Sequence, residues 1–117
     1  MSNLITTEQL EEVIFSIVGF AGEAKSHAYR ALTLAEEGDF LGAEEALKEC
    51  DGAVLQAHHV QTDMIQKEAG GNKVEISMLF VHAQDHLMTA LSERELIKKL
   101  IRMNKRFYEL EKKIDNK

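Results

Sequence analysis

The chain has 117 residues, a length typical of one domain, and we expect a single domain over residues 1–117. Its 20 acidic and 14 basic side chains give a net charge of −6. This balance argues against a nucleic-acid partner, because phosphates demand a basic surface. No apolar run approaches the ~20 residues of a membrane span and no charged, apolar leader opens the chain. We therefore expect a cytoplasmic protein that meets a membrane only indirectly.

The composition favours an all-α fold. The chain has no proline, only seven glycines, and many residues with high helix propensity. Three long helices are predicted, at about 7–37, 40–68 and 76–113, joined by two short connections. Helices joined in this way form an antiparallel, up-down-up bundle.

The first helix is predicted to begin after Thr6, because the run Thr6–Gln9 resembles a capping box. Gly38 suits the left-handed position after a helix, and Asp39 can cap the next one. Apolar residues with alternating spacings of four and three predict the buried face of this first helix: Leu10, Ile14, Ile17, Ala21, Ala24, Ala28, Ala31 and Ala35.

The same spacing predicts the buried faces of the other two helices. In the second helix these positions are Ala43, Ala46 or Leu47, Cys50, Ala53 or Val54, Ala57, Val60 or Gln61, and Met64. In the third they are Leu79, His82, His86, Thr89, Glu93, Leu96, Leu100, Met103, Phe107, Leu110 and Ile114. The third helix also has a second apolar stripe, Phe80, Leu87, Ile97 and Ile101, which a lone three-helix subunit would leave exposed. The extra stripe predicts self-association.

The polar run His82-Ala83-Gln84-Asp85-His86 interrupts an apolar segment of the third helix. Because helix positions i, i+3 and i+4 share a face, His82, Asp85 and His86 are expected to cluster. Ionisable groups on an apolar face are costly unless something pairs with them. An uncharged imidazole such as that of His82 can attack phosphorus and hold a phosphoryl group. His86 and Gln84 are candidate supporting groups, although Gln84 faces away.

Other interpretations use the same residues. Histidines four positions apart can chelate one ion, so His82, Asp85 and His86 could form the site of a helical-bundle metal-binding protein or hydrolase. His58 or His59 could support the site or add a ligand. The histidines could also only pack in a structural bundle. The chain has no nucleotide-binding motif, so a phosphoryl group would have to come from another protein.

The run Val81–Thr89 resembles the active-site segment of the lactose/cellobiose-type enzyme IIA of the bacterial phosphoenolpyruvate-dependent sugar phosphotransferase system. The segments Ala57–Thr62 and Ala24–Tyr29 resemble the corresponding parts of the family's other helices. The resemblance therefore extends over nearly the whole chain.

This resemblance implies a homotrimer of three-helix subunits, nine helices in all. It implies that His82 becomes a tele-phosphohistidine, whereas the residues themselves leave open which ring nitrogen reacts. The donor would be the phosphocarrier protein HPr, and the acceptor a cysteine of the cognate enzyme IIB. Uptake through enzyme IIC would serve a β-linked disaccharide of the lactose, cellobiose or chitobiose class. Asp85 would meet its copies on the trimer axis and bind one Mg²⁺ or similar divalent cation per trimer.

Overall fold

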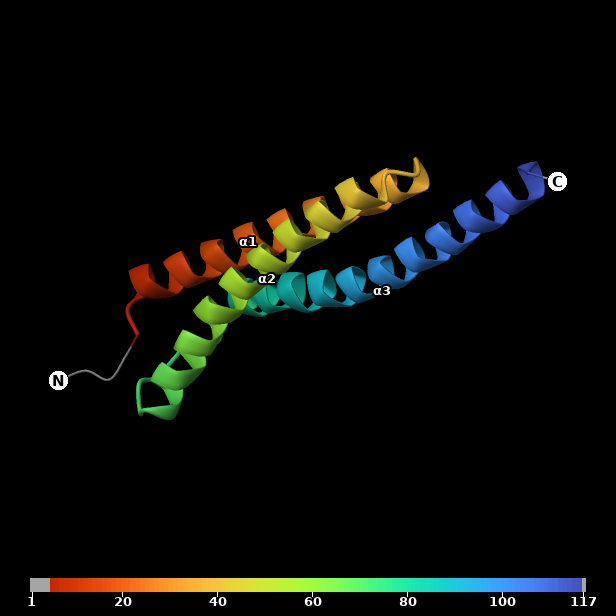
Figure 1. Ribbon diagram of the computed structural model, residues 1–117. Helices are drawn as coiled ribbons and strands as arrows, with labels where there is room; N and C mark the ends of the chain where they lie inside the picture. The colour runs from red at the N-terminus through yellow and green to blue at the C-terminus, as the bar shows by residue number, and fades with distance from the viewer. Residues whose placement is uncertain (1–4, 117) are drawn as a thin grey trace.

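The computed structural model describes residues 5–116, which form three helices (Figure 1). Helix α1 spans Thr7–Glu36, α2 spans Phe40–Ala69 and α3 spans Met78–Asp115. The predicted all-α, up-down-up bundle is confirmed, and α3 begins and ends two residues later than expected. Helices α1 and α2 form an antiparallel hairpin, and α3 runs in the direction of α1 with its C-terminal end beyond the hairpin (Figure 1). The molecule measures 76 × 21 × 17 Å.

Local side-chain caps set the helix ends. The side chain of Thr6 accepts a hydrogen bond from the Gln9 backbone N–H at 3.1 Å, and the Gln9 side chain accepts one from the Thr6 N–H at 3.0 Å. This reciprocal pair is the predicted capping box. Asp39 caps α2 as expected, and Ser77 caps α3. Gly38 has φ 87°, the left-handed conformation that lets the chain turn between α1 and α2.

The buried faces of α1 and α2 agree with the predictions from apolar spacing. All eight predicted positions of α1 are buried, from Leu10 to Ala35. The buried residues of α2 likewise fall on its predicted face, from Ala43 to Met64. Alanine predominates on both faces, so the two helices approach closely along the hairpin.

The predicted buried face of α3 is wrong. The helix buries Ala83, Leu87, Ala90 and Ile97, which follow the second apolar stripe of the sequence. The predicted face, from Leu79 to Ile114, lies on the outside of the subunit. The reason is steric: Ala83 and Ala90 let α3 settle against the hairpin, where larger side chains at these positions would hold it away.

Ion pairs join α3 to both helices of the hairpin. Asp51 of α2 lies 3.4 Å from Arg94 Nη1 and 3.6 Å from Lys98 Nζ, and Lys25 of α1 lies 3.9 Å from Glu93. These contacts connect α3 to both other helices midway along its length. Because these side chains are partly exposed, each pair adds little to the stability of the packing, which depends mainly on the buried residues of α3.

Candidate functional site

The imidazole rings of His82 and His86 form a pair on the outer side of α3. Their Nε2 atoms are 3.0 Å apart, and the rings meet edge to face at 84° with centroids 4.5 Å apart. His82 is exposed and His86 is half-buried. Two nitrogen lone pairs at this distance repel, so one of the two Nε2 atoms carries a proton and donates to the other. The predicted i, i+4 cluster is therefore present for the histidines.

The core beneath α3 holds this pair in place. Ala83 and Leu87 are fully buried and belong to a cluster with Ile14 and Ile17 of α1. Each histidine precedes one of these anchors in the sequence. Because successive helix residues are about 100° apart, burying the anchors directs the imidazoles to the flank of the helix. The apolar pattern thus sets the direction of the reactive rings.

Asp85 is exposed on α3 and makes no hydrogen bond or ion pair with His82 or His86. Among residues 5–116, its carboxylate has no ion-pair or hydrogen-bond partner, and only its backbone carbonyl accepts a bond, from Thr89. Asp85 lies eleven residues before Leu96, slightly more than three whole helical turns. The carboxylate therefore shares a face with the exposed apolar residues of the C-terminal half of α3, rather than completing a site with His82 and His86.

The sequence predicted that Gln84 faces away from His82, and in the structure its side chain points toward α2. Its Oε1 atom accepts a hydrogen bond from Gln61 Nε2 at 2.8 Å, in a partly buried position. The partners are 23 residues apart, so helical periodicity alone could not reveal this contact. Gln61 holds Gln84 against the hairpin, two residues from each histidine of the pair.

His58 and His59 both lie exposed on α2. The structure shows no hydrogen bond from either one to His82 or His86. No group of three or more His, Cys, Asp or Glu side chains in the described part of the chain is arranged to hold a metal ion. Within the described residues of one subunit, His82, Asp85 and His86 therefore do not come together as the metal site that the sequence suggested.

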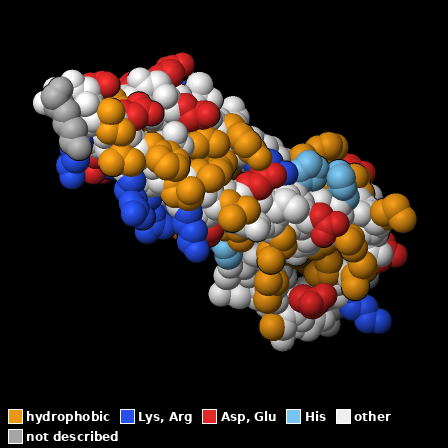
Figure 2. Space-filling view, turned by 90° about the vertical axis from the view of Figure 1, so that its right-hand side faces the viewer, with side chains coloured by type: hydrophobic (Ala, Val, Ile, Leu, Met, Phe, Trp, Pro, Cys, Tyr) orange, Lys and Arg blue, Asp and Glu red, His pale blue; other side chains and the backbone are white. Residues whose placement is uncertain are grey.

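The exposed face of α3 is apolar over most of its C-terminal half. Its exposed large side chains are Leu96, Leu100, Met103, Phe107, Leu110 and Ile114. Figure 2 shows hydrophobic side chains gathered in a patch bordered by Lys and Arg side chains, with histidines exposed nearer the other end. A face of this kind is typical of a protein interface.

Cys50 is the other chemically reactive side chain, and it is buried. Burial raises the pKa of its thiol, the neighbouring Asp51 adds to the rise, and Arg94 and Lys98 oppose it. The thiol therefore stays protonated and inert at neutral pH, as a buried structural cysteine.

None of the helices in residues 5–116 is long and apolar enough to span a bilayer.

Comparison with known proteins gives consistent matches. Residues 12–105 match the family model described as "PTS system, Lactose/Cellobiose specific IIA subunit". The N,N'-diacetylchitobiose-specific EIIA component of Escherichia coli K12 is 43% identical over 99 residues, which cover 85% of each chain. Both matches include the whole histidine segment of α3.

Two solved structures have the same fold. The cellobiose-specific enzyme IIA of Bacillus anthracis superposes with a TM-score of 0.83 at 41% identity, covering 89% of this chain and 94% of that one. The IIA(Chitobiose) component of Escherichia coli, solved in complex with HPr, superposes with a TM-score of 0.75 at 41% identity, covering 85% and 96%. The likeness therefore holds in sequence and in structure.

Proposed function

Since the chain belongs to the lactose/cellobiose-specific IIA family of the phosphotransferase system, we propose that His82 is the residue that carries its phosphoryl group. The chain is a phosphotransferase component and acts as a phosphocarrier. The observation that supports His82 is its exposed imidazole, whose Nε2 atom has a defined partner 3.0 Å away. A carrier residue must be reachable by two proteins in turn, and His82 satisfies this requirement.

The histidine pair supplies the proton arrangement that transfer needs. With the shared proton on His86 Nε2, the Nε2 atom of His82 carries no proton, its lone pair accepts the hydrogen bond from His86 until the donor arrives, and the proton of His82 rests on Nδ1. That lone pair attacks phosphorus while the bond from phosphorus to the donor breaks. The N–H of His86 can then turn from the ring nitrogen to a phosphoryl oxygen, where a charge-assisted hydrogen bond stabilises the product. This arrangement favours the tele nitrogen as the acceptor.

The partners follow from the family and from the solved relative that binds HPr. We infer that phospho-HPr donates to His82 and that a cysteine of the cognate enzyme IIB accepts from it. The relatives act in chitobiose, lichenan, lactose and cellobiose systems, so the pathway is expected to import a β-linked disaccharide or a related oligosaccharide. The chain would work in the cytoplasm, where a soluble relay meets these partners.

The exposed face of α3 supports a homotrimer. From Leu96 to Ile114 its apolar residues alternate in spacings of four and three, the heptad pattern of a coiled coil. Arg106 and Glu111 flank this seam, five residues apart, so in a parallel assembly each Arg106 faces a neighbour's glutamate. An antiparallel assembly would instead bring Arg106 near Lys99 or Lys113. The charges therefore favour a parallel arrangement.

A parallel assembly places copies of Asp85 close together, because Asp85 shares a face with Leu96. Converging carboxylates repel, and a hard divalent cation relieves the repulsion through oxygen ligands. A single subunit lacks the ligands for such a site among its described residues. Carboxylates from several copies would fit Mg²⁺, so we expect one such ion per trimer, with a structural role at the axis.

The assignment of His82 is tested by phosphoryl transfer. Incubation with phosphoenolpyruvate, enzyme I and HPr is expected to add one acid-labile phosphoryl group per chain, measured by intact mass. The variant His82→Gln should take up none, whereas the control His59→Gln, an exposed histidine on α2, should label fully. Label that persists in His82→Gln would refute the assignment.

A further inference from the structure

The two Nε2 atoms of the histidine pair lie at a distance that one metal ion can bridge. Bonds from an imidazole nitrogen to a transition metal are about 2.0–2.1 Å long. With the two nitrogens 3.0 Å apart, an ion bound to both would have an N–metal–N angle of about 94°. A tetrahedral ion such as Zn²⁺ needs an angle near about 109°, which requires about 3.3–3.4 Å between the nitrogens. The spacing is therefore closer to the right angles of square-planar and octahedral ions such as Cu²⁺ and Ni²⁺.

A small movement of the two rings would aim both nitrogen lone pairs at one ion. The nitrogens now share a proton along the line between them, so each lone pair would turn by roughly 40° to meet a metal bonded to both. Histidine rings turn readily about the bond that joins them to Cβ, and His82 is exposed to solvent. The proton on Nε2 of His86 would move to Nδ1 of the same ring, so both rings would bind the metal in their neutral form. Two histidines four residues apart on a helix are a recurrent pair of metal ligands.

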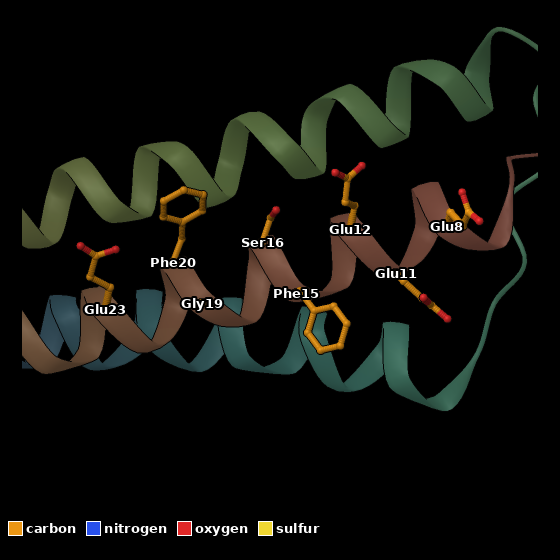
Figure 3. Close-up of a pocket in the computed structure, with 8 residues that line it drawn as sticks. All are labelled: Glu8, Glu11, Glu12, Phe15, Ser16, Gly19, Phe20 and Glu23. Atoms are coloured by element: carbon orange, nitrogen blue, oxygen red, sulfur yellow. The ribbon is translucent and has the colours of Figure 1, made fainter.

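The acidic surface of α1 is the main competing place for a cation, and its side chains diverge. Glutamates line a shallow groove along the first half of this helix (Figure 3). Glu11 and Glu12 are adjacent in the sequence but point to opposite sides of α1. Carboxylate oxygens also prefer hard ions such as Mg²⁺, whereas imidazole nitrogens suit Cu²⁺ and Ni²⁺. Among the described residues, a transition metal therefore finds better-matched ligands at the histidine pair than on α1.

We propose that His82 and His86 form a two-nitrogen site for a divalent transition metal of the Ni²⁺ or Cu²⁺ class, and that this metal competes with the phosphoryl group for Nε2 of His82. The site differs from the three-residue site that the sequence suggested, because Asp85 takes no part in it and water fills the remaining coordination positions. A metal on the lone pair of His82 Nε2 leaves no electron pair to attack phosphorus, and a phosphoryl group on the same atom leaves none for the metal. Each ligand therefore lowers the affinity of the protein for the other. Metal binding stands independently of the proposed function, whereas the competition rests on it.

Calorimetric titration of the intact, unphosphorylated protein with Ni²⁺ tests the site. We expect one ion per chain, whereas an ion on the expected trimer axis would bind once per three chains. His82→Gln and His86→Gln each leave a single imidazole and should weaken Ni²⁺ binding at least about 100-fold, because the second bond of a chelate forms within one molecule. The matched controls are His59→Gln, which removes an exposed histidine of α2, and Glu11→Gln/Glu12→Gln, and both should bind like wild type. No binding by wild type, or equal binding by wild type and His86→Gln, would overturn the site and leave the phosphocarrier function intact.

The competition is tested first on protein that carries one phosphoryl group, as measured by intact mass. This form should bind Ni²⁺ as weakly as His82→Gln does. If it kept the wild-type affinity while His82→Gln lost it, the phosphoryl group would lie on another residue, which would refute the assignment of His82 but not the metal site.

The second arm measures the rate of transfer from phospho-HPr by rapid quench. Free Ni²⁺ at about ten times its Kd should slow transfer to the wild-type protein about tenfold, and EDTA should restore the rate. In His86→Gln, where Ni²⁺ binds weakly, the same addition should change the rate less than about twofold. An unchanged wild-type rate at saturating Ni²⁺ would overturn the competition. Equal slowing of wild type and His86→Gln would also overturn it, because Ni²⁺ would then act on the donor.

Discussion

The exposed stripe of α3 predicts that self-association depends on its apolar side chains, and Leu110 offers a quantitative test. Leu110 is 55% exposed in the subunit. Complete burial of a leucine contributes about 1.5–3 kcal/mol, so burying the exposed half contributes roughly 0.8–1.6 kcal/mol per subunit. Three copies in a trimer contribute roughly 2.5–5 kcal/mol. Because 1.4 kcal/mol is a tenfold change, Leu110→Ala should weaken the trimer association constant about 10²- to 10⁴-fold.

The matched control for this prediction is Leu55→Ala. Leu55 lies on α2, away from the stripe, and is also 55% exposed. Leucine and alanine both favour helices, so neither variant should change helix content measurably. Sedimentation equilibrium over a range of concentrations measures the association constant of each variant.

The contrast between the two variants decides the outcome. We expect Leu55→Ala to associate like wild type and Leu110→Ala to dissociate at higher concentrations. If Leu110→Ala kept the wild-type association constant, the α3 stripe would not be the subunit interface. If both variants dissociated alike, the interface would lie elsewhere or be nonspecific.

Three further predictions concern other parts of the molecule. Asp85→Leu should leave the free energy of trimer association unchanged or make it about 1–4 kcal/mol more favourable, because converging charges become apolar contacts. A shift to monomer in sedimentation would contradict the placement of Asp85 on the trimer axis. Leu87→Ala should lower the free energy of unfolding by about 2–5 kcal/mol in urea titrations at fixed protein concentration, and a loss below ~1 kcal/mol would show that Leu87 is not a core residue. Cys50 should react with a thiol reagent far more slowly in the folded than in the unfolded protein. Equal labelling rates in the folded and unfolded protein would contradict the burial of Cys50. Burial also raises the pKa of the Cys50 thiol. The contribution of this thiol to the free energy of unfolding is therefore complete below its unfolded-state pKa and is lost as the pH rises through its folded-state pKa.

Local patterns in the sequence determined much of the bundle. The buried faces of α1 and α2 followed from apolar spacing, because each helix has one alanine-rich stripe and a partner that packs along it. The caps at Thr6 and Asp39 and the turn at Gly38 followed from chemistry within a few residues. The contact between His82 and His86 was also predictable, because side chains four positions apart are neighbours on any helix.

Only the tertiary structure decided which side of α3 faces its own subunit. Both stripes of α3 have helical spacing and apolar residues, so periodicity cannot distinguish them. The choice depends mainly on steric fit, because Ala83 and Ala90 admit the hairpin closely, and ion pairs such as Asp51 with Arg94 add a smaller contribution. These contacts join residues far apart in the sequence, and their energies depend on distances that exist only in the folded chain. For the same reason, the sequence alone could not show that His82 is exposed.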